Sequence, residues 1–517
     1  MKAPAAARRA FLARAVGLAA ASFFRPAFAA TAALRFSDNP FTLGIASGSP
    51  RSDSVVLWTR LAPKPLEMGG GMAPDSIDVA WEVAHDDKFS KIVRRGTVLA
   101  GPSRAHAVHV ECDGLEPSRK YFYRFIAGGV ASPVGRTRTT PAAGQGDERL
   151  RIALASCQQY EQGFFAAHRH IAAEDPDLVA FVGDYIYESS WGREHVRKHS
   201  TSEPHTLADY RARYAQYKSD ADLQLAHRAC PWIVTWDDHE VDNDYASDRS
   251  EDLDQNFVAR RAAAYRAFFE HHPMRASVLL DGVGIRIYDR FDWGSLATLH
   301  VLDDRQYRSY QSCPKPMRGG GNVVGEECTE RLNPDRTMLG AAQEAWLAEG
   351  LARSTGRWNL ITQQTLFAPA VRPSEKGPQH WTDGWEGYPA ARERLAAQLA
   401  DGRASNPVIL GGDVHCAYVA DVQEKPGVAG SRVVATEFCA TSITSQGTSA
   451  KVVQDYLNTN PHLRYGNAAH RGYTLIDLGR DKLEAKQRVI ETPKKTDPAV
   501  STHASFTVEA GRAGVLR

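Results

Sequence analysis

The sequence has little cysteine and no excess of charge of either sign. Seven cysteines in 517 residues are too few for a disulfide scaffold in a chain this long. With 62 Lys+Arg against 61 Asp+Glu, the net charge is +1. The chain therefore lacks the basic excess that is typical of proteins that bind nucleic-acid phosphates. Hydrophobic residues at 43% and charged residues at 24% exclude a disordered chain. No run after the N-terminal segment is apolar enough to predict a transmembrane helix.

The first 29 residues are typical of a secretory signal. A basic start is followed by a short apolar run, and Pro26-Ala27-Phe28-Ala29 ends the segment in a small-x-small cleavage pattern. Arg8-Arg9-Ala10-Phe11-Leu12 resembles a twin-arginine signal, which predicts a partner in the export machinery that carries folded proteins and a periplasmic or secreted location. An ordinary secretory signal with a chance arginine pair is the alternative. The segment holds five basic residues and no acid, so its removal leaves a slightly negative chain.

Residues 40–145 have the pattern of a small all-β sandwich. Apolar and polar residues alternate in runs such as 54–60, 77–83 and 120–125, with Gly, Pro and Asp clusters between them. Thr139-Thr140-Pro141 begins a linker that runs to about residue 146.

Residues 149–510 predict a layered α/β domain, in which short buried strands alternate with helices. The apolar runs are Leu150–Ala155, Leu178–Val182, Trp232–Trp236, Leu296–Leu302, Trp358–Ile361 and Pro407–Leu410. The helical stretches are 162–173, 206–218, 255–270, 340–353 and 389–400.

A polar cluster follows each of these apolar runs. The clusters are Ser156-Cys157-Gln158, Gly183–Glu188, Asp237-Asp238-His239-Glu240, Asp303-Asp304-Arg305, Gln363-Gln364 and Gly411–His415. Ligand sites in open α/β sheets lie beyond the carboxyl ends of the strands, so these side chains are expected to converge. Thiol, carboxylate, phenol and imidazole together are metal-ligand chemistry.

The ordered set of motifs resembles the calcineurin-like metallophosphoesterase superfamily, and within it the PhoD-type alkaline phosphatases. The motifs are SCQ at 156–158, GDYIYE at 183–188, WDDHE at 236–240, LDDRQYR at 302–308, GGDVH at 411–415 and NPHLRYGNAAHRGY at 460–473. The resemblance covers nearly the whole chain. It implies a metallophosphoesterase β-sandwich flanked by helices, with the small N-terminal β-sandwich preceding it.

The resemblance also implies two metal sites. Cys157, Asp184, Tyr187 and His415 form the first, whose thiolate, phenolate, carboxylate and imidazole suit Fe(III). Asp184, Asp238 and Asp413 form the second, whose oxygen donors suit Ca²⁺. Some relatives carry an additional calcium, for which Asp237, Asn243 and Gln364 are candidates.

The chemistry expected from these sites is hydrolysis of phosphomonoesters and phosphodiesters by metal-activated hydroxide, for phosphate scavenging. His239 is predicted to act on the leaving oxygen as acid or orienter. Arg305 either presents its planar fork to phosphate or pairs with Asp304. His470 and Arg471 are candidates to close the pocket.

Two other functions compete with this one. A phospholipase D-like phosphodiesterase that takes phospholipid headgroups would use the same metal site as an enzyme for small phosphate esters. A secreted binding protein with a degenerate site is disfavoured because every ligand type is present.

Two further features have alternative interpretations. Cys313 and Cys328 flank a glycine-rich loop and are expected to pair in an oxidising compartment. Trp381, Trp385 and Tyr388 form either a lid or substrate wall, or the packed core of a loop.

Overall fold

The computed structural model describes residues 36, 38–146, 149–280 and 284–516. The predicted signal segment at 1–29 lies outside the described residues. The residues from Phe36 onward belong to one unit.

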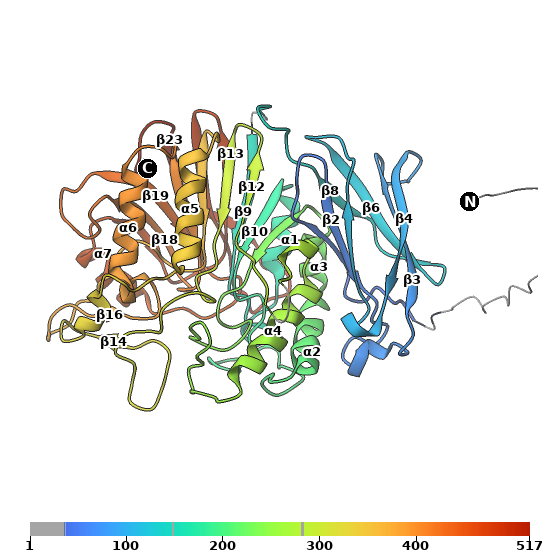
Figure 1. Ribbon diagram of the computed structural model, residues 1–517, viewed down its shortest axis with the longest axis horizontal. Helices are drawn as coiled ribbons and strands as arrows, with labels where there is room; N and C mark the ends of the chain where they lie inside the picture. The colour runs from blue at the N-terminus through green and yellow to red at the C-terminus, as the bar shows by residue number, and fades with distance from the viewer. Residues whose placement is uncertain (1–35, 37, 147–148, 281–283, 517) are drawn as a thin grey trace, which may run out of the picture. The chain divides into compact units, whose positions relative to one another are not determined.

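The N-terminal region is a β-sandwich, as the alternating pattern predicted (Figure 1, blue). One layer contains β1 Ile45–Gly48, β2 Val55–Arg60 and β5 Ala107–Cys112. The other contains β3 Ile77–Ala84, β4 Ile92–Ala100, β6 Lys120–Ala127, β7 Val130–Ala131 and β8 Gly135–Arg138. Buried residues of both layers, such as Leu57, Val79 and Tyr123, share one hydrophobic core. Strand β1 also pairs with β11 of the following domain through Gly48 and Trp232, so the first layer continues a larger sheet.

Two sheets pack face to face in the following domain. The first runs β23-β22-β21-β9-β10-β11 before it reaches β1, and the second runs β12-β13-β15-β17-β19-β18-β20. The strands of the first are β9 Arg149–Ala155, β10 Leu178–Val182, β11 Trp232–Thr235, β21 Arg471–Gly479, β22 Lys482–Ile490 and β23 Val500–Glu509. Those of the second are β12 Asp289–Trp293, β13 Ala297–Val301, β15 Trp358–Thr362, β17 Pro407–Gly411, β18 Ala417–Gln423, β19 Val433–Cys439 and β20 Leu463–Asn467.

Alternate residues of the central strands explain this layering. Ile152 and Leu154 of β9 pack with Leu299, Leu360 and Val408 of the opposite sheet to form the shared core. Ala153 and Ala155, one residue out of phase, belong instead to the core beneath the helices. Each central strand is therefore buried on both faces, which is why it reads as a continuous apolar run.

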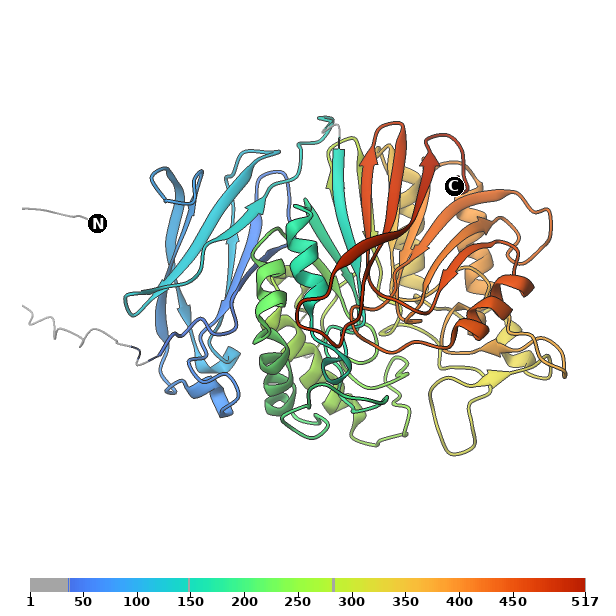
Figure 2. The same ribbon diagram turned by 180° about the vertical axis from the view of Figure 1, so that it is seen from behind.

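Helices cover both outer faces of the paired sheets (Figures 1 and 2). The first sheet is covered by α1 Ala166–Ala173, α2 Leu207–Lys218, α3 Ala221–His227 and α4 Phe257–His271. The second is covered by α5 Ala341–Arg353 and α6 Pro389–Ala400, while α7 Ala450–Thr459 lies beside β20. The five predicted helices are confirmed to within a few residues, and α3 and α7 were not predicted. No helix among the described residues has both the length and the apolar character needed to cross a bilayer.

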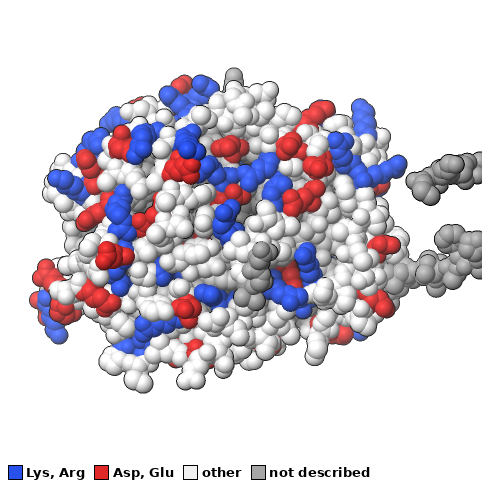
Figure 3. Space-filling model, viewed as in Figure 1, with Lys and Arg blue, Asp and Glu red and all other residues white. Residues whose placement is uncertain are grey.

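The predicted pairing of Cys313 with Cys328 is confirmed, because the two sulfurs are bonded. The bond closes a loop that contains β14 Val323–Val324, which pairs with β16 His380–Trp381. On the face shown in Figure 3, acidic and basic side chains are interspersed, as the balanced composition suggests.

The carboxyl ends of the parallel strands meet at one edge. β9, β10 and β11 are parallel neighbours, as are β13, β15 and β17. At this edge Gln364, after β15, donates to the Thr235 hydroxyl of β11 at 2.6 Å. The two sheets are thus joined where the polar clusters emerge.

We expect Trp58→Ala to lower the free energy of unfolding by about 3–5 kcal/mol, because it empties a fully buried site. The Trp58 indole of β2 donates to the Glu270 carbonyl of α4 at 3.0 Å and therefore links the N-terminal sheet to the helical layer. Urea unfolding measures the loss. Trp381→Ala is the matched control, because that indole is 43% exposed. Equal shifts in the two variants would contradict this role for Trp58.

Candidate metal centre

The backbone turns sharply at the ends of three central strands. Cys157 after β9, Asp184 after β10, and Asp413 and His415 after β17 have φ values of 59°, 58°, 65° and 54°. Such left-handed conformations are uncommon for residues other than glycine and cost about 1–3 kcal/mol each. They persist only where the surroundings fix them, and they cluster at functional sites.

These turns bring the four residues predicted for the first site together. Ligand atoms of Cys157, Asp184 and His415 all lie within 4.8 Å of one another. The Tyr187 hydroxyl donates to Asp184 Oδ2 at 2.7 Å and lies 3.0 Å from His415 Nε2. His415 Nδ1 lies 2.9 Å from the Gln446 carbonyl, which directs Nε2 toward the group.

The first group has a chemistry that fits a cation. Asp184 Oδ1 is buried and has no hydrogen-bond partner among the described residues, which is unusual for a carboxylate oxygen. Burial, reinforced by the Asp184 carboxylate, raises the pKa of the Cys157 thiol well above its ordinary value, and the same causes raise the pKa of Tyr187. A bound cation would supply the missing partner and favour the thiolate and phenolate.

The second predicted group is only partly assembled. Asp238 lies within 4.8 Å of Asp184 and His239. Asp413 is outside that group, although it faces the same carboxylates, and its Oδ2 accepts a hydrogen bond from Thr365 Oγ1 at 2.6 Å. Burial raises the pKa of Asp413 to about 6.

A third acidic group was not predicted. Asp238, Asp244 and Asp383 present carboxylate oxygens within 4.8 Å of one another, and all three residues are buried. Burial and the neighbouring Asp383 and Asp238 carboxylates raise the pKa of Asp244 well above its ordinary value. The acidic run after WDDHE contains Asp244 and could have indicated that this residue belongs to a carboxylate group. Asp383 comes from a remote loop with no motif to mark it.

The residues considered for an additional calcium have other partners. Asp237 pairs with Arg305, and the Asn243 amide donates to Glu251 at 2.9 Å. Besides Thr235, the Gln364 amide donates to the Leu302 carbonyl at 2.9 Å. Asp237 belongs to none of the groups of three or more Asp, Glu, His or Cys side chains that the described residues form, although its Oδ2 is buried without a hydrogen-bond partner.

Arg305 is buried among carboxylates. Its Nε binds Asp237, its Nη1 binds Asp383 at 2.8 Å, and its Nη2 lies 3.6 Å from Asp238. Of the two expected interactions, the geometry favours ion pairing, with Asp237 and Asp383 as partners in place of Asp304. Burial disfavours the Asp238 carboxylate, but Arg305 and His239 outweigh this effect and hold its pKa below the ordinary value.

His239 is oriented by a carboxylate that was not singled out. Its Nδ1 lies 2.7 Å from Glu188 Oε2, and its ring packs on Tyr187 with the centroids 4.1 Å apart. Among the described residues this leaves Nε2 as the unengaged ring nitrogen. Burial opposes a charge here, but Glu188, Asp238 and Asp184 together raise the pKa of His239 well above its ordinary value.

Two further buried groups hold the turns in place. The Glu240 carboxylate accepts hydrogen bonds from the backbone N–H groups of Asp184, Tyr185 and Asp237, at 3.1, 2.5 and 2.8 Å, and so joins two loops. Arg471 donates to the His415 carbonyl and to Ala468. It therefore supports the 411–415 loop from behind. His470 is half-buried beside Asn467.

Comparison with known proteins agrees with this architecture. Residues 152–487 match the PhoD-like phosphatase family, and residues 27–141 match the N-terminal domain of PhoD-like phosphatases. The chain is 45% identical to alkaline phosphatase D of Bacillus subtilis (strain 168) over 504 residues, covering 95% of this chain and 84% of that protein. A solved structure of PhoD is 44% identical and superimposes with a TM-score of 0.87, covering 93% of this chain and 94% of that one.

We expect Arg305→Ala to lower the free energy of unfolding by about 3–5 kcal/mol, because it leaves Asp237 buried without its guanidinium partner and removes one of the two arginines that pair with Asp383. Chemical denaturation of the purified variant measures the change. Arg403→Ala removes an exposed pairing with Asp401 and should leave unfolding unchanged. Indistinguishable stability of Arg305→Ala and the native chain would show that Arg305 is not the structural counter-charge.

Proposed function

Because the chain belongs to the PhoD-like phosphatase family, we propose that it is an exported metalloenzyme that hydrolyses phosphomonoesters and phosphodiesters to release phosphate for uptake. The observation that carries this proposal is the convergence of Cys157, Asp184 and His415 within 4.8 Å, with the Tyr187 hydroxyl bonded to Asp184. The twin-arginine-like sequence at 8–12 supports export of the folded, metal-loaded protein.

The donor chemistry supports iron and calcium as the metals. Cys157, Asp184, Tyr187 and His415 would hold Fe(III), which prefers thiolate, phenolate, imidazole and carboxylate. Asp184, Asp238 and Asp413 would hold Ca²⁺, since they offer oxygen alone. The group of Asp238, Asp244 and Asp383 suits an additional Ca²⁺ by the same reasoning. When bound, these cations would withdraw electron density from the phosphate and stabilise in-line displacement at phosphorus.

The protein's own residues divide the remaining work. His239 holds a proton at Nε2 for the leaving alkoxide, because Glu188 fixes the ring through Nδ1 and the surrounding carboxylates favour the charged form. The burial of Cys157, Asp184 and Tyr187 excludes water from the iron side. Arg305 acts as a positioning residue, because its ion pairs hold Asp237 and Asp238 in the orientation that the second site needs.

The substrate panel that tests this function contains p-nitrophenyl phosphate, bis-p-nitrophenyl phosphate and phosphatidylcholine. We expect hydrolysis of the first two, loss of turnover in EGTA, and recovery on addition of Ca²⁺. Full activity in EGTA would remove calcium from the proposal. Turnover of phosphatidylcholine that exceeds both small esters would favour the phospholipase D-like alternative. A purified protein that stays inactive after iron and calcium supplementation would contradict the proposed function.

We expect Cys157→Ala to lose bound iron and most of its activity while its fold stays intact, because the variant removes the thiolate donor. Elemental analysis and p-nitrophenyl phosphate hydrolysis measure the two losses, and circular dichroism checks the fold. Cys230→Ala is the matched control, because Cys230 is also a buried free cysteine but lies in the helical core. Retained iron in Cys157→Ala would show that Cys157 is not a ligand.

A further inference from the structure

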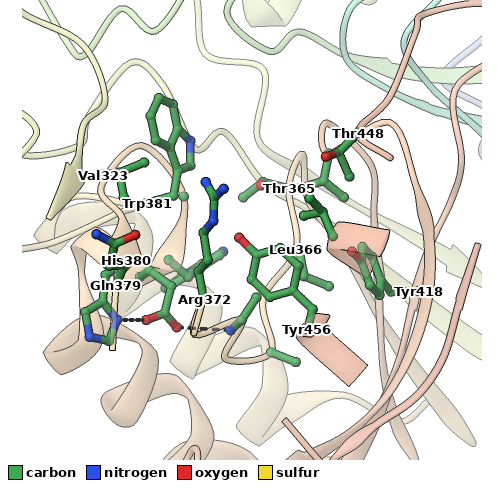
Figure 4. Close-up of a pocket in the computed structure, with 17 residues that line it drawn as sticks. Val323, Thr365, Leu366, Arg372, Gln379, His380, Trp381, Tyr418, Thr448 and Tyr456 are labelled. Atoms are coloured by element: carbon green, nitrogen blue, oxygen red, sulfur yellow. Dashed lines mark hydrogen bonds and ion pairs between the residues drawn. The ribbon is translucent and has the colours of Figure 1, made fainter. Parts of the chain in front are cut away.

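A cavity of about 390 Å³ lies beside the 411–415 loop, within the size range of small-molecule sites (Figure 4). Val414 lines it, between the candidate ligands Asp413 and His415. Thr365 also lines it while its hydroxyl holds Asp413. The cavity and the metal centre therefore share a wall.

The metal centre opens to solvent on this same side. Cys157, Asp184, Tyr187 and Asp238 are each no more than 4% exposed, whereas Asp413 and His415 are half-buried. A phosphate that enters past Asp413 and His415 would thus leave the remainder of its ester beside Val414, at the edge of the cavity.

The walls of the cavity are mainly apolar and aromatic. Trp381 of β16, Tyr418 of β18, and Val452 and Tyr456 of α7 face it, together with Leu366. Trp381 is 43% exposed. It belongs to the aromatic cluster for which the sequence allowed two interpretations, a lid or substrate wall and the packed core of a loop. Trp385 and Tyr388 are buried in the adjoining core, and Trp385 also lines the cavity, so only Tyr388 belongs to the packed core alone.

The Trp381 wall is braced covalently. Trp381 pairs with Val323, which also lines the cavity and lies inside the loop closed by Cys313 and Cys328. On the opposite side, the Ser449 hydroxyl caps the first turn of α7 by accepting from Val452 N–H. The two walls are therefore each fixed by contacts within their own segment.

The charged side chains at the cavity differ in their partners, and one of them, Arg372, is exposed to solvent. Glu386 lines the cavity, but it is already paired with Arg392 and His380. Arg372 has no ion-pair partner among the described residues, and its side chain rises between the Trp381 and Tyr456 rings in Figure 4. Burial raises the pKa of Tyr456, and the positive charge of Arg372 opposes this shift.

We propose that this cavity is a subsite for the alcohol part of the substrate, and that the preferred alcohol is aromatic and carries an anionic group. This inference rests on the proposed phosphatase function and adds a substrate class to it. The ring would stack on Trp381 and Tyr456, since aromatic pairs favour offset or edge contacts. The anionic group would meet Arg372, whose planar fork suits a carboxylate or a second phosphate.

The stacking wall is tested by comparing the native enzyme with the Trp381→Ala variant on three substrates. These are 1-naphthyl phosphate, octyl phosphate and glycerol 2-phosphate. We expect the ratio of kcat/KM for the naphthyl ester to that for glycerol 2-phosphate to fall about tenfold in the variant. Val452→Trp, which fills the cavity from α7, should lower the same ratio. Leu99→Ala, a 62% exposed residue of β4, is the control and should leave the ratio unchanged.

The anionic preference is tested with phenyl phosphate and 4-carboxyphenyl phosphate. Arg372→Gln should lower the preference for the carboxylated ester about threefold to fivefold, as expected for a charge contact made by an exposed side chain. Arg95→Gln, an exposed arginine of β4, is the matched control.

The outcomes separate the subsite from the enzyme. A native protein that hydrolyses none of these esters contradicts the phosphatase function itself. The aromatic subsite is overturned if the native enzyme is active but Trp381→Ala lowers kcat/KM equally for the three esters. It is also overturned if kcat/KM falls more for octyl phosphate than for the naphthyl ester. An unchanged carboxylate preference in Arg372→Gln overturns the anionic part of the proposal.

Discussion

The carboxylates gathered beyond the strand ends need positive charge, and much of the architecture serves that need. Asp184, Asp237, Asp238, Asp244 and Asp413 surround one small volume of the protein. Burial and mutual repulsion raise the pKa of Asp237 and Asp244, although Arg305 opposes the shift in both. Folding raises the pKa of such a carboxyl above the pKa that it has in the unfolded chain. The folded state therefore loses stability as the pH rises above that unfolded-state pKa. Arginine can offset only part of this cost, so bound cations should contribute to folding as well as to chemistry.

Backbone strain at the same edge has a related origin. A strand that ends by continuing straight would direct its next side chains along the sheet, whereas left-handed turns at Cys157, Asp184 and Asp413 redirect them toward a common point. The surrounding hydrogen bonds compensate for these turns. Glu240 anchors the 183–185 backbone, and Arg471 anchors the carbonyl of His415. The geometry of the centre is thus set in part by Glu240 and Arg471, which are not candidate ligands, as is common for positioned ligand sets.

The sequence was informative wherever one local pattern decided the structure. The apolar runs gave the central strands because such strands are buried on both faces, and their ends located Cys157, Asp184 and His415. The long antiparallel strand β22, with the sequence KLEAKQRVI, was missed because its Lys, Glu and Gln residues are good helix formers. Its pairing with β21 and β23 overrides that preference. The partners of Arg305 and the place of Asp383 depend on loops that approach from far along the chain, and no local pattern records such an approach.

The division of labour between strands and loops bears on how specificity arises. The candidate metal ligands follow central strands that are fixed by two hydrophobic cores. The cavity beside them is bounded largely by segments outside that framework, namely the disulfide-closed loop, β16 and α7. Changes in these segments can alter the alcohol that fits without moving Asp184 or His415, because loops tolerate substitution better than packed strands. The Asp413–His415 loop joins the two regions, since its candidate ligands belong to the acidic centre while Val414 lines the cavity. Phosphate esters share the phosphate group and differ in their alcohol part. Any preference among them should therefore be sought on the Val414 side of this loop, and not among the candidate ligands.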